Sequence, residues 1–223
     1  MSVSLFLAGG SSTTLDGMDT ANPHHDAELW RRLVDAASFA VTIHARQIRK
    51  GSGVPYIAHL LGVASLVLDH GGDEEQAIAG LLHDAIEDAG VHQEAVITER
   101  FGPRVAGIVR ACTDADTMPK PPWRARKEAY IAHLASATPD ALLVSACDKL
   151  HNARAICTDL RTYGLAVYDR FTGAQDGTLW YYRTLATAFS HLLPGALAVD
   201  LDEAVGTMER LSFRPSSRAD AAQ

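Results

Sequence analysis

The sequence of 223 residues lacks any apolar run close to the ~20 residues that a membrane-spanning helix needs, and it is poor in cysteine and aromatic residues. Its three cysteines, Cys112, Cys147 and Cys157, are odd in number and show no C-x-x-C spacing. This pattern argues against a disulfide framework and against a zinc knuckle, and a reducing cytoplasm is the expected compartment. A net charge of −7 disfavours broad binding to nucleic acid or to an anionic membrane, but it leaves room for a local basic pocket.

The two ends of the chain are expected to be flexible and to carry no chemistry. Residues 1–25 are rich in Gly, Ser and Thr and lack the basic region and long apolar core of a signal peptide. Residues 214–223 have the composition of a disordered tail. We therefore expect one domain, formed by residues 26–213.

The pattern of apolar residues within this domain is helical throughout. Apolar side chains recur with a period near 3.6 residues, and no stretch alternates as a half-buried strand would. Pro103 suits a first helical position, and Thr138 or Asp140 is a plausible N-cap. The sequence predicts an all-α, multi-helix bundle with helices over 26–48, 57–70, 73–89, 92–102, 103–113, 124–136, 138–161, 175–193 and 196–212.

Four polar residues interrupt apolar helix faces. His59 lies in the second predicted helix, His83 and Asp84 are adjacent in the third, and Asp148 is the only acid in the run ALLVSACDKL. Each alone has an ordinary explanation, such as a hydrogen-bonded core histidine or a salt-bridged acid. Together, unpaired polar groups on buried faces would cost on the order of a few kcal/mol each. Convergence of these side chains on one divalent ion inside the bundle removes that cost.

Two further acids, Glu87 and Asp88, lie four residues beyond His83 and Asp84. On a continuous helix they point the same way, one turn further along. A divalent ion lowers the pKa of a water molecule that it holds, and a nearby carboxylate can accept the proton. Ligand softness alone fits manganese, iron or zinc.

The pattern His59, His83-Asp84, Asp148 resembles the H…HD…D signature of HD-domain metallohydrolases. The segments RKGSGVPYIAH, LLHDAIEDAG, ERFGPRVAGIVRACTD and CDKLHNAR resemble, more closely, the (p)ppGpp hydrolase domain of RelA/SpoT proteins and their small stand-alone relatives. The resemblance covers about residues 30–195. It implies a compact helical HD-domain bundle with a metal site between helices.

The resemblance also implies roles for individual residues. The four signature residues match metal ligands, with Mn²⁺ the usual ion, and Glu87 and Asp88 match the pair that handles the attacking water. Matches on the nucleotide side are Arg49, Lys50, Lys120 in the loop after the TD motif, and Asn152 near the sugar. Independently of the resemblance, several cations close to the predicted ligands suit a polyphosphate, namely Arg46, Arg49, Lys50, Lys149, Arg154 and Arg161.

The implied activity is hydrolysis of the ester between a ribose 3′-oxygen and pyrophosphate, with a small-molecule nucleotide as substrate. Two departures from the long RelA/SpoT pattern, Ala155 and the segment 170–185, leave guanine and adenine alarmones both open. Within that segment Trp180, Tyr181 and Tyr182 are candidates for a substrate wall. The alternatives are another HD phosphohydrolase, acting on a nucleoside monophosphate or the 2′-phosphate of NADPH, and a non-catalytic alarmone-binding module. The sequence does not indicate an oligomeric state.

Overall fold

The structure, a computed structural model, describes residues 27–115 and 119–213. The predicted leader, residues 1–25, and the predicted tail, residues 214–223, lie outside the described residues. Within the described ranges every named element is a helix, and one isolated β-bridge pairs Ile48 with Pro55. The all-α prediction is confirmed. None of the helices in these ranges has the length and apolar character needed to cross a membrane.

The helices follow one another with short connections. In chain order they are α1 (Ala27–Ile43), α2 (Ile57–Asp69), α3 (Glu74–Leu82), α4 (Ala85–Ala89), α5 (Gln93–Phe101), α6 (Pro103–Cys112), α7 (Trp123–Leu134), α8 (Pro139–Tyr163), the 3-10 helix η2 (Gly164–Arg170), α9 (Ala174–Leu192) and α10 (Ala196–Ser212). The first predicted helix therefore ends five residues early, and η2 was not predicted.

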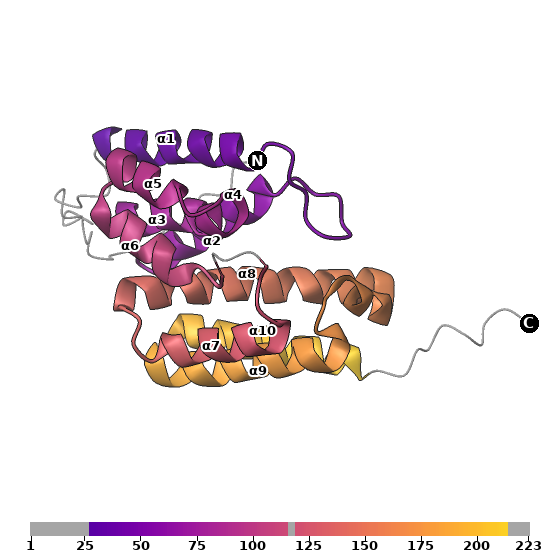
Figure 1. The fold of residues 1–223 in the computed structure, drawn as a ribbon. Helices are drawn as coiled ribbons and strands as arrows, with labels where there is room; N and C mark the ends of the chain where they lie inside the picture. Colours follow the sequence, from indigo (N-terminus) through magenta and orange to yellow (C-terminus); the bar gives the residue numbers. More distant parts are fainter. Residues whose placement is uncertain (1–26, 116–118, 214–223) are drawn as a thin grey trace, which may run out of the picture.

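The long helix α8 lies between two groups of helices (Figure 1). It packs against α2, α3 and α6 on one side and against α9 and α10 on the other, and α7 packs against α9. Because both sides of α8 are covered, buried residues such as Val144, Leu150 and Ile156 are distributed around it. The helix that carries Asp148 thus runs through the middle of the molecule.

Local sequence signals account for several helix starts. Asp73 and Gln76 form a reciprocal capping box at the start of α3. Thr138 accepts a hydrogen bond from the Ala141 amide and caps α8, as predicted. Pro103 occupies the first position of α6, also as predicted.

The prediction of one continuous helix over residues 73–89 is wrong. Helix α3 ends at Leu82 and α4 begins at Ala85, so His83 and Asp84 form a turn between them. Asp84 has φ −95° and ψ −1°, in the sparsely populated bridge region that many active-site residues occupy. The Gly80 carbonyl, which would accept from the residue 84 amide in a continuous helix, accepts a 2.8 Å hydrogen bond from the His83 imidazole.

Candidate metal centre and adjoining cavity

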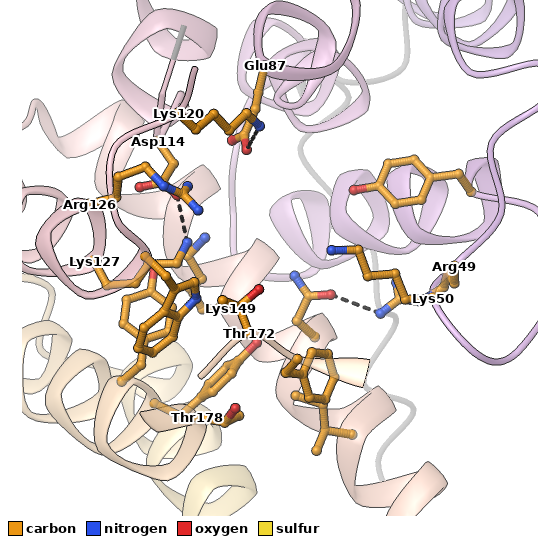
Figure 2. Close-up of a pocket in the computed structure, with 17 residues that line it drawn as sticks. Arg49, Lys50, Glu87, Asp114, Lys120, Arg126, Lys127, Lys149, Thr172 and Thr178 are labelled. Carbon is orange, nitrogen blue, oxygen red and sulfur yellow. Dashed lines mark hydrogen bonds and ion pairs between the residues drawn. The ribbon is translucent and has the colours of Figure 1, made fainter. Parts of the chain in front are cut away.

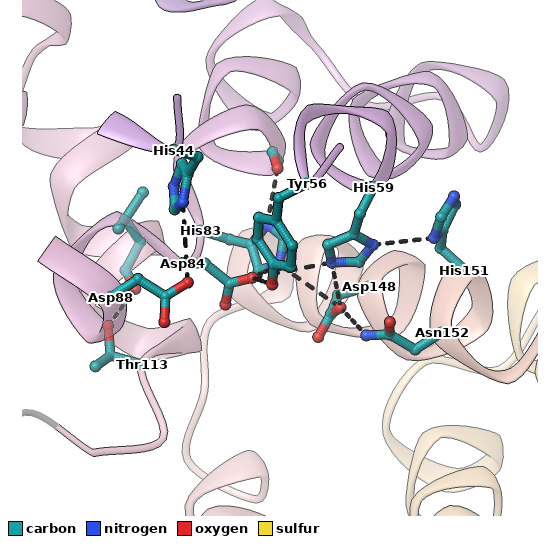
Figure 3. Close-up of polar contacts among 12 residues, drawn as sticks. His44, Tyr56, His59, His83, Asp84, Asp88, Thr113, Asp148, His151 and Asn152 are labelled. Carbon is teal, nitrogen blue, oxygen red and sulfur yellow. Dashed lines mark hydrogen bonds and ion pairs between the residues drawn. The ribbon is translucent and has the colours of Figure 1, made fainter. Parts of the chain in front are cut away.

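Four side chains from three parts of the chain meet beside α8. His59 comes from α2, Asp148 from α8, and His83 and Asp84 from the turn after α3 (Figure 3). The His59 Nε2 atom lies 3.2 Å from Asp148 Oδ1. The His83 Nε2 atom lies 3.1 Å from Asp84 Oδ2 and 3.6 Å from Asp148 Oδ1. The structure therefore brings together all four residues that the sequence singles out as metal ligands.

The outer nitrogen of each imidazole has a partner, which directs the inner nitrogen into the cluster. His59 Nδ1 lies 2.9 Å from Nδ1 of His151, and His83 Nδ1 donates to the Gly80 carbonyl. With the proton on Nδ1, each Nε2 presents a lone pair to carboxylate oxygens, which also carry only lone pairs. The His83 Nε2 atom is buried and has no hydrogen-bond partner. A cation between these atoms satisfies all of them.

The carboxylates are oriented by neighbouring donors. The Tyr56 hydroxyl donates to Asp84 Oδ2. Asn152 Nδ2 donates to Asp148 Oδ1 at 2.6 Å, and Lys149 Nζ donates to Asp148 Oδ2 at 2.6 Å. Partners of this kind hold ligands in place around a metal ion.

The electrostatics of the cluster favour positive charge. Burial lowers the pKa of His83, but the carboxylates of Asp84 and Asp148 overcome this and raise its pKa well above the usual range. Burial alone would raise the pKa of Asp148, yet Lys149 and the two imidazoles hold that pKa well below its usual range. The cluster thus stabilises a positive charge at the position where the four side chains meet.

The donor set decides what can bind there. Single ligand atoms of His59, His83 and Asp84 lie within 4.8 Å of one another, and Asp148 adds a second carboxylate. Imidazole nitrogen with carboxylate oxygen is a typical combination for a divalent first-row metal ion. The cluster is therefore a candidate divalent metal site, and its residues fit such an ion.

Glu87 and Asp88 lie on α4 beside this cluster. Asp88 Oδ2 accepts a 2.8 Å hydrogen bond from Gln47 and lies 3.9 Å from His44 Nδ1. Burial raises the pKa of Asp88, although the Gln47 hydrogen bond opposes the shift. Glu87 Oε1 accepts a 2.7 Å hydrogen bond from Lys120. Together with Asp84, both acids line a cavity of about 300 Å³.

A second cavity of about 450 Å³ adjoins the first and shares part of its wall (Figure 2). Four of the five residues predicted to bind substrate line it, namely Arg49, Lys50, Lys120 and Asn152, and Arg49 donates to Asn152 Oδ1 at 2.9 Å. The fifth, Arg46, is exposed and lines neither cavity. The cations Arg154 and Arg161 also lie elsewhere, in a groove beside α10.

Sequence reasoning missed part of the larger cavity. Tyr181 and Tyr182 line it, as the suggested aromatic wall requires, whereas Trp180 does not. The residues that sequence reasoning did not find come mainly from α7 and the loop before it, and they include Asp114, Trp123, Arg126 and Lys127. The run WRARK at the start of α7 could have indicated these residues, because cations at the N-terminal end of a helix oppose the helix dipole. Tyr56, His151 and Gln47 were also missed, because nothing in their spacing marks them as partners of the cluster.

A helical bundle with a His/His-Asp/Asp cluster at its centre defines a known class of protein. Residues 36–179 match the profile of the HD domain, and the chain belongs to the HD-domain family.

Individual proteins within this family are similar to the chain. The chain is 39% identical over 125 residues to the guanosine-3′,5′-bis(diphosphate) 3′-pyrophosphohydrolase MESH1 of Xenopus tropicalis, covering 55% of this chain and 68% of that protein. It is 36% identical over 126 residues to MESH1 of Homo sapiens, again covering 55% of this chain and 68% of that protein. Among solved structures, a metazoan orthologue of SpoT described as hydrolysing ppGpp superposes with a TM-score of 0.64 and 26% identity, covering 82% of this chain and 97% of that one.

Proposed function

We propose that this protein hydrolyses the 3′-pyrophosphate of alarmone nucleotides, (p)ppGpp, (pp)pApp or both. Water and the nucleotide would yield pyrophosphate and a nucleoside 5′-di- or triphosphate, with the bond between the ribose 3′-oxygen and phosphorus broken. The MESH1 relatives carry this activity in their names. The proposal agrees with the cavity beside the cluster, which is lined by cations.

The observation that carries the proposal is the direct contact between the candidate metal site and that cavity. Lys149 Nζ bonds Asp148 in the cluster and also lines the cavity, and Asn152 does the same through its amide. A phosphate held among these cations therefore lies next to the cluster. Pocket volumes of about 300–1,000 Å³ are typical for small-molecule ligands, and this cavity falls within that range.

Four side chains would hold the ion in this proposal, namely His59, His83, Asp84 and Asp148. A divalent ion bound there supplies Lewis acidity, which acidifies water and draws charge from a phosphate oxygen. We propose Mn²⁺ as the resident ion on the strength of the family resemblance. Iron and zinc satisfy the same donor set.

The remaining roles belong to the acids and cations of the cavity. Asp88 has its pKa raised by burial, which makes it a stronger proton acceptor, and we assign it removal of the proton from the attacking water. Glu87, held by Lys120, orients that water. Arg49 and Lys50 neutralise phosphate charge, and Asn152 contacts the sugar in this assignment.

The test is incubation of the manganese-loaded protein with ppGpp and ppApp together, followed by anion-exchange chromatography. We expect pyrophosphate with GDP or ADP, and the nucleotide consumed faster identifies the preferred base. The variant carrying His83→Ala and Asp84→Ala should release neither product. If both alarmones survive, the proposal fails, and release of phosphate from NADPH or a nucleoside monophosphate would establish the other phosphohydrolase class.

A single substitution separates an enzyme from a binding module. Glu87→Gln keeps the size of the side chain and, in our assignment, leaves the metal ligands intact. We expect turnover to fall by about 10²-fold, as for misplacement of the attacking water, while calorimetry shows unchanged Mn²⁺ binding. A protein that only senses the nucleotide would bind ppGpp equally well with either residue and cleave it with neither.

A further inference from the structure

The larger cavity has a second charged wall, formed by Arg126 and Lys127 near the start of α7 together with Asp114, and distinct from the metal cluster. Arg126 Nη1 and Lys127 Nζ both contact the same oxygen, Oδ2 of Asp114, at 2.5 and 2.7 Å. The three side chains are 15%, 18% and 8% exposed. One largely buried carboxylate therefore faces two largely buried cations, which we call the α7 cation pair. The wall keeps a net positive charge.

Two features of this wall cost free energy in the absence of a ligand. The first turn of α7 contains no acid, and cations at the N-terminal end of a helix oppose its dipole. Burial also lowers the pKa of Lys127, which means that desolvation works against its charged form. A fold that needed these positions only for packing would be more stable with apolar residues there. An anion bound to the pair offsets both costs.

The rest of the cavity shows where such an anion would lie. Among the described residues, six cations and two carboxylates line the space, so positive charge is in excess. Arg49 and Lys50 stand on one wall and the α7 cation pair on the opposite wall (Figure 2). Lys149 lines the cavity and bonds Asp148 of the cluster, so it links the metal site to this cationic space. A ligand that satisfies both walls carries more than one phosphate group.

We infer that the α7 cation pair binds a second phosphate group of the substrate, separate from the phosphorus that water attacks. The inference rests on the proposed function and deepens it, because it makes a nucleotide with an additional phosphate the preferred substrate over a simple monophosphate. That phosphate belongs either to the far end of the 3′-pyrophosphate or to the 5′-chain. Both offer the same oxygens to a guanidinium and an ammonium group.

The first measurement needs no turnover. Calorimetry compares binding of inorganic pyrophosphate, which stands for the 3′-group, with binding of GDP, which carries the 5′-chain. The variant Arg126→Gln removes one cation and retains a nitrogen at the position of Nε, the Arg126 atom that donates to the Pro121 carbonyl. We expect it to weaken binding of at least one probe by about tenfold to a hundredfold, as for a lost charged hydrogen bond. The weakened probe identifies the phosphate.

The chain offers a matched control on the same helix. Arg124 is also near the start of α7, but it pairs with Glu128, stacks on Trp180 and does not line the cavity. Arg124→Gln should leave both affinities within about twofold of the parent protein. Lys127→Gln provides a second cavity variant if Arg126→Gln unfolds, as judged by circular dichroism. Equal binding by the parent protein and both cavity variants overturns the inference.

Kinetics then separate substrate recognition from a general structural effect. We expect the cavity variants to raise KM for ppGpp by the same factor with kcat nearly unchanged. A fall in kcat with unaltered KM would contradict a binding role and overturn the inference. The outcomes also distinguish the two proposals: if the anion probes respond as expected but ppGpp is not cleaved by the parent protein, the α7 site stands and the proposed hydrolysis fails.

Discussion

The clearest test of the candidate metal site changes a residue that is not one of its four ligands. His151 lies one ring away from the cluster, with its Nδ1 atom 2.9 Å from Nδ1 of His59. Burial lowers the pKa of His151 to about 4, so at neutral pH the ring is uncharged and its Nδ1 atom can accept a hydrogen bond from Nδ1 of His59. That hydrogen bond keeps the proton of His59 on Nδ1 and leaves Nε2 free to bind a cation.

The variant His151→Phe keeps an aromatic ring against His59 but removes the acceptor. His59 is then expected to move its proton to Nε2, where Asp148 accepts it, and the lone pair needed for a metal is lost. Loss of such a supporting partner typically weakens metal affinity by about 10–100-fold, which corresponds to about 1.4–2.8 kcal/mol. Titration calorimetry of the metal-free protein with Mn²⁺ measures this directly.

A second substitution reaches the same residue from α2. A Cβ atom at Gly62 would lie 2.3 Å from Nε2 of His151, so Gly62→Ala forces that imidazole away from His59. Gly107 is a matched control, because a Cβ there meets nothing within 4 Å. We expect Gly62→Ala to weaken Mn²⁺ binding as His151→Phe does, and Gly107→Ala to leave it unchanged. Affinity within twofold of the parent protein for both Gly62→Ala and His151→Phe would refute the reasoning.

Three further outcomes are expected. Gly51 has φ +78°, and a Cβ atom there would lie 2.2 Å from Nε of Arg170, whereas Gly53 has φ +71° and a Cβ atom there meets nothing within 4 Å. Left-handed strain alone costs about 1–2 kcal/mol for an alanine. In urea unfolding, Gly51→Ala should therefore lower the free energy of unfolding by more than this amount, and Gly53→Ala should not. The second outcome concerns Asp73 at the start of α3. Partial burial raises the pKa of Asp73, but hydrogen bonds from the first turn of α3 and from Arg104 outweigh burial and hold this pKa below 3.8. Its stabilisation is thus present above that pH and is lost as pH falls through the lowered value, so Asp73→Ala should cost about 0.5–2 kcal/mol at pH 7 and much less near pH 2. Mn²⁺ at a hundred times its dissociation constant should stabilise the protein by about 2.7 kcal/mol in thermal unfolding, and a chelator should reverse the gain.

Much of the candidate site was predictable from sequence because the four candidate metal ligands are unusual residues in apolar surroundings. His59 and Asp148 stand out because they lie among the buried apolar residues of their helices, and pairing of such groups is the general way to offset their desolvation. The α7 wall was not predictable in the same way. Arg126 and Lys127 look like the solvated face of a basic helix until the fold places Asp114 against them. Arg46 was predicted to bind substrate because it lies close in sequence to Arg49 and Lys50, but the fold leaves it outside the cavity.

The break after α3 explains both the wrong helix prediction and the geometry of the cluster. Residues 80–90 contain good helix formers and no proline, so local propensity favours continuity. On a continuous helix, however, neighbouring side chains point about 100° apart, and His83 and Asp84 would diverge. The turn lets His83 Nε2 and Asp84 Oδ2 approach to 3.1 Å. It also changes the direction of the chain, so that Glu87 and Asp88 of α4 line the smaller cavity. The helix is interrupted where two adjacent side chains must point toward the same position. The hydrogen bond from the His83 imidazole to the Gly80 carbonyl compensates for the missing backbone hydrogen bond.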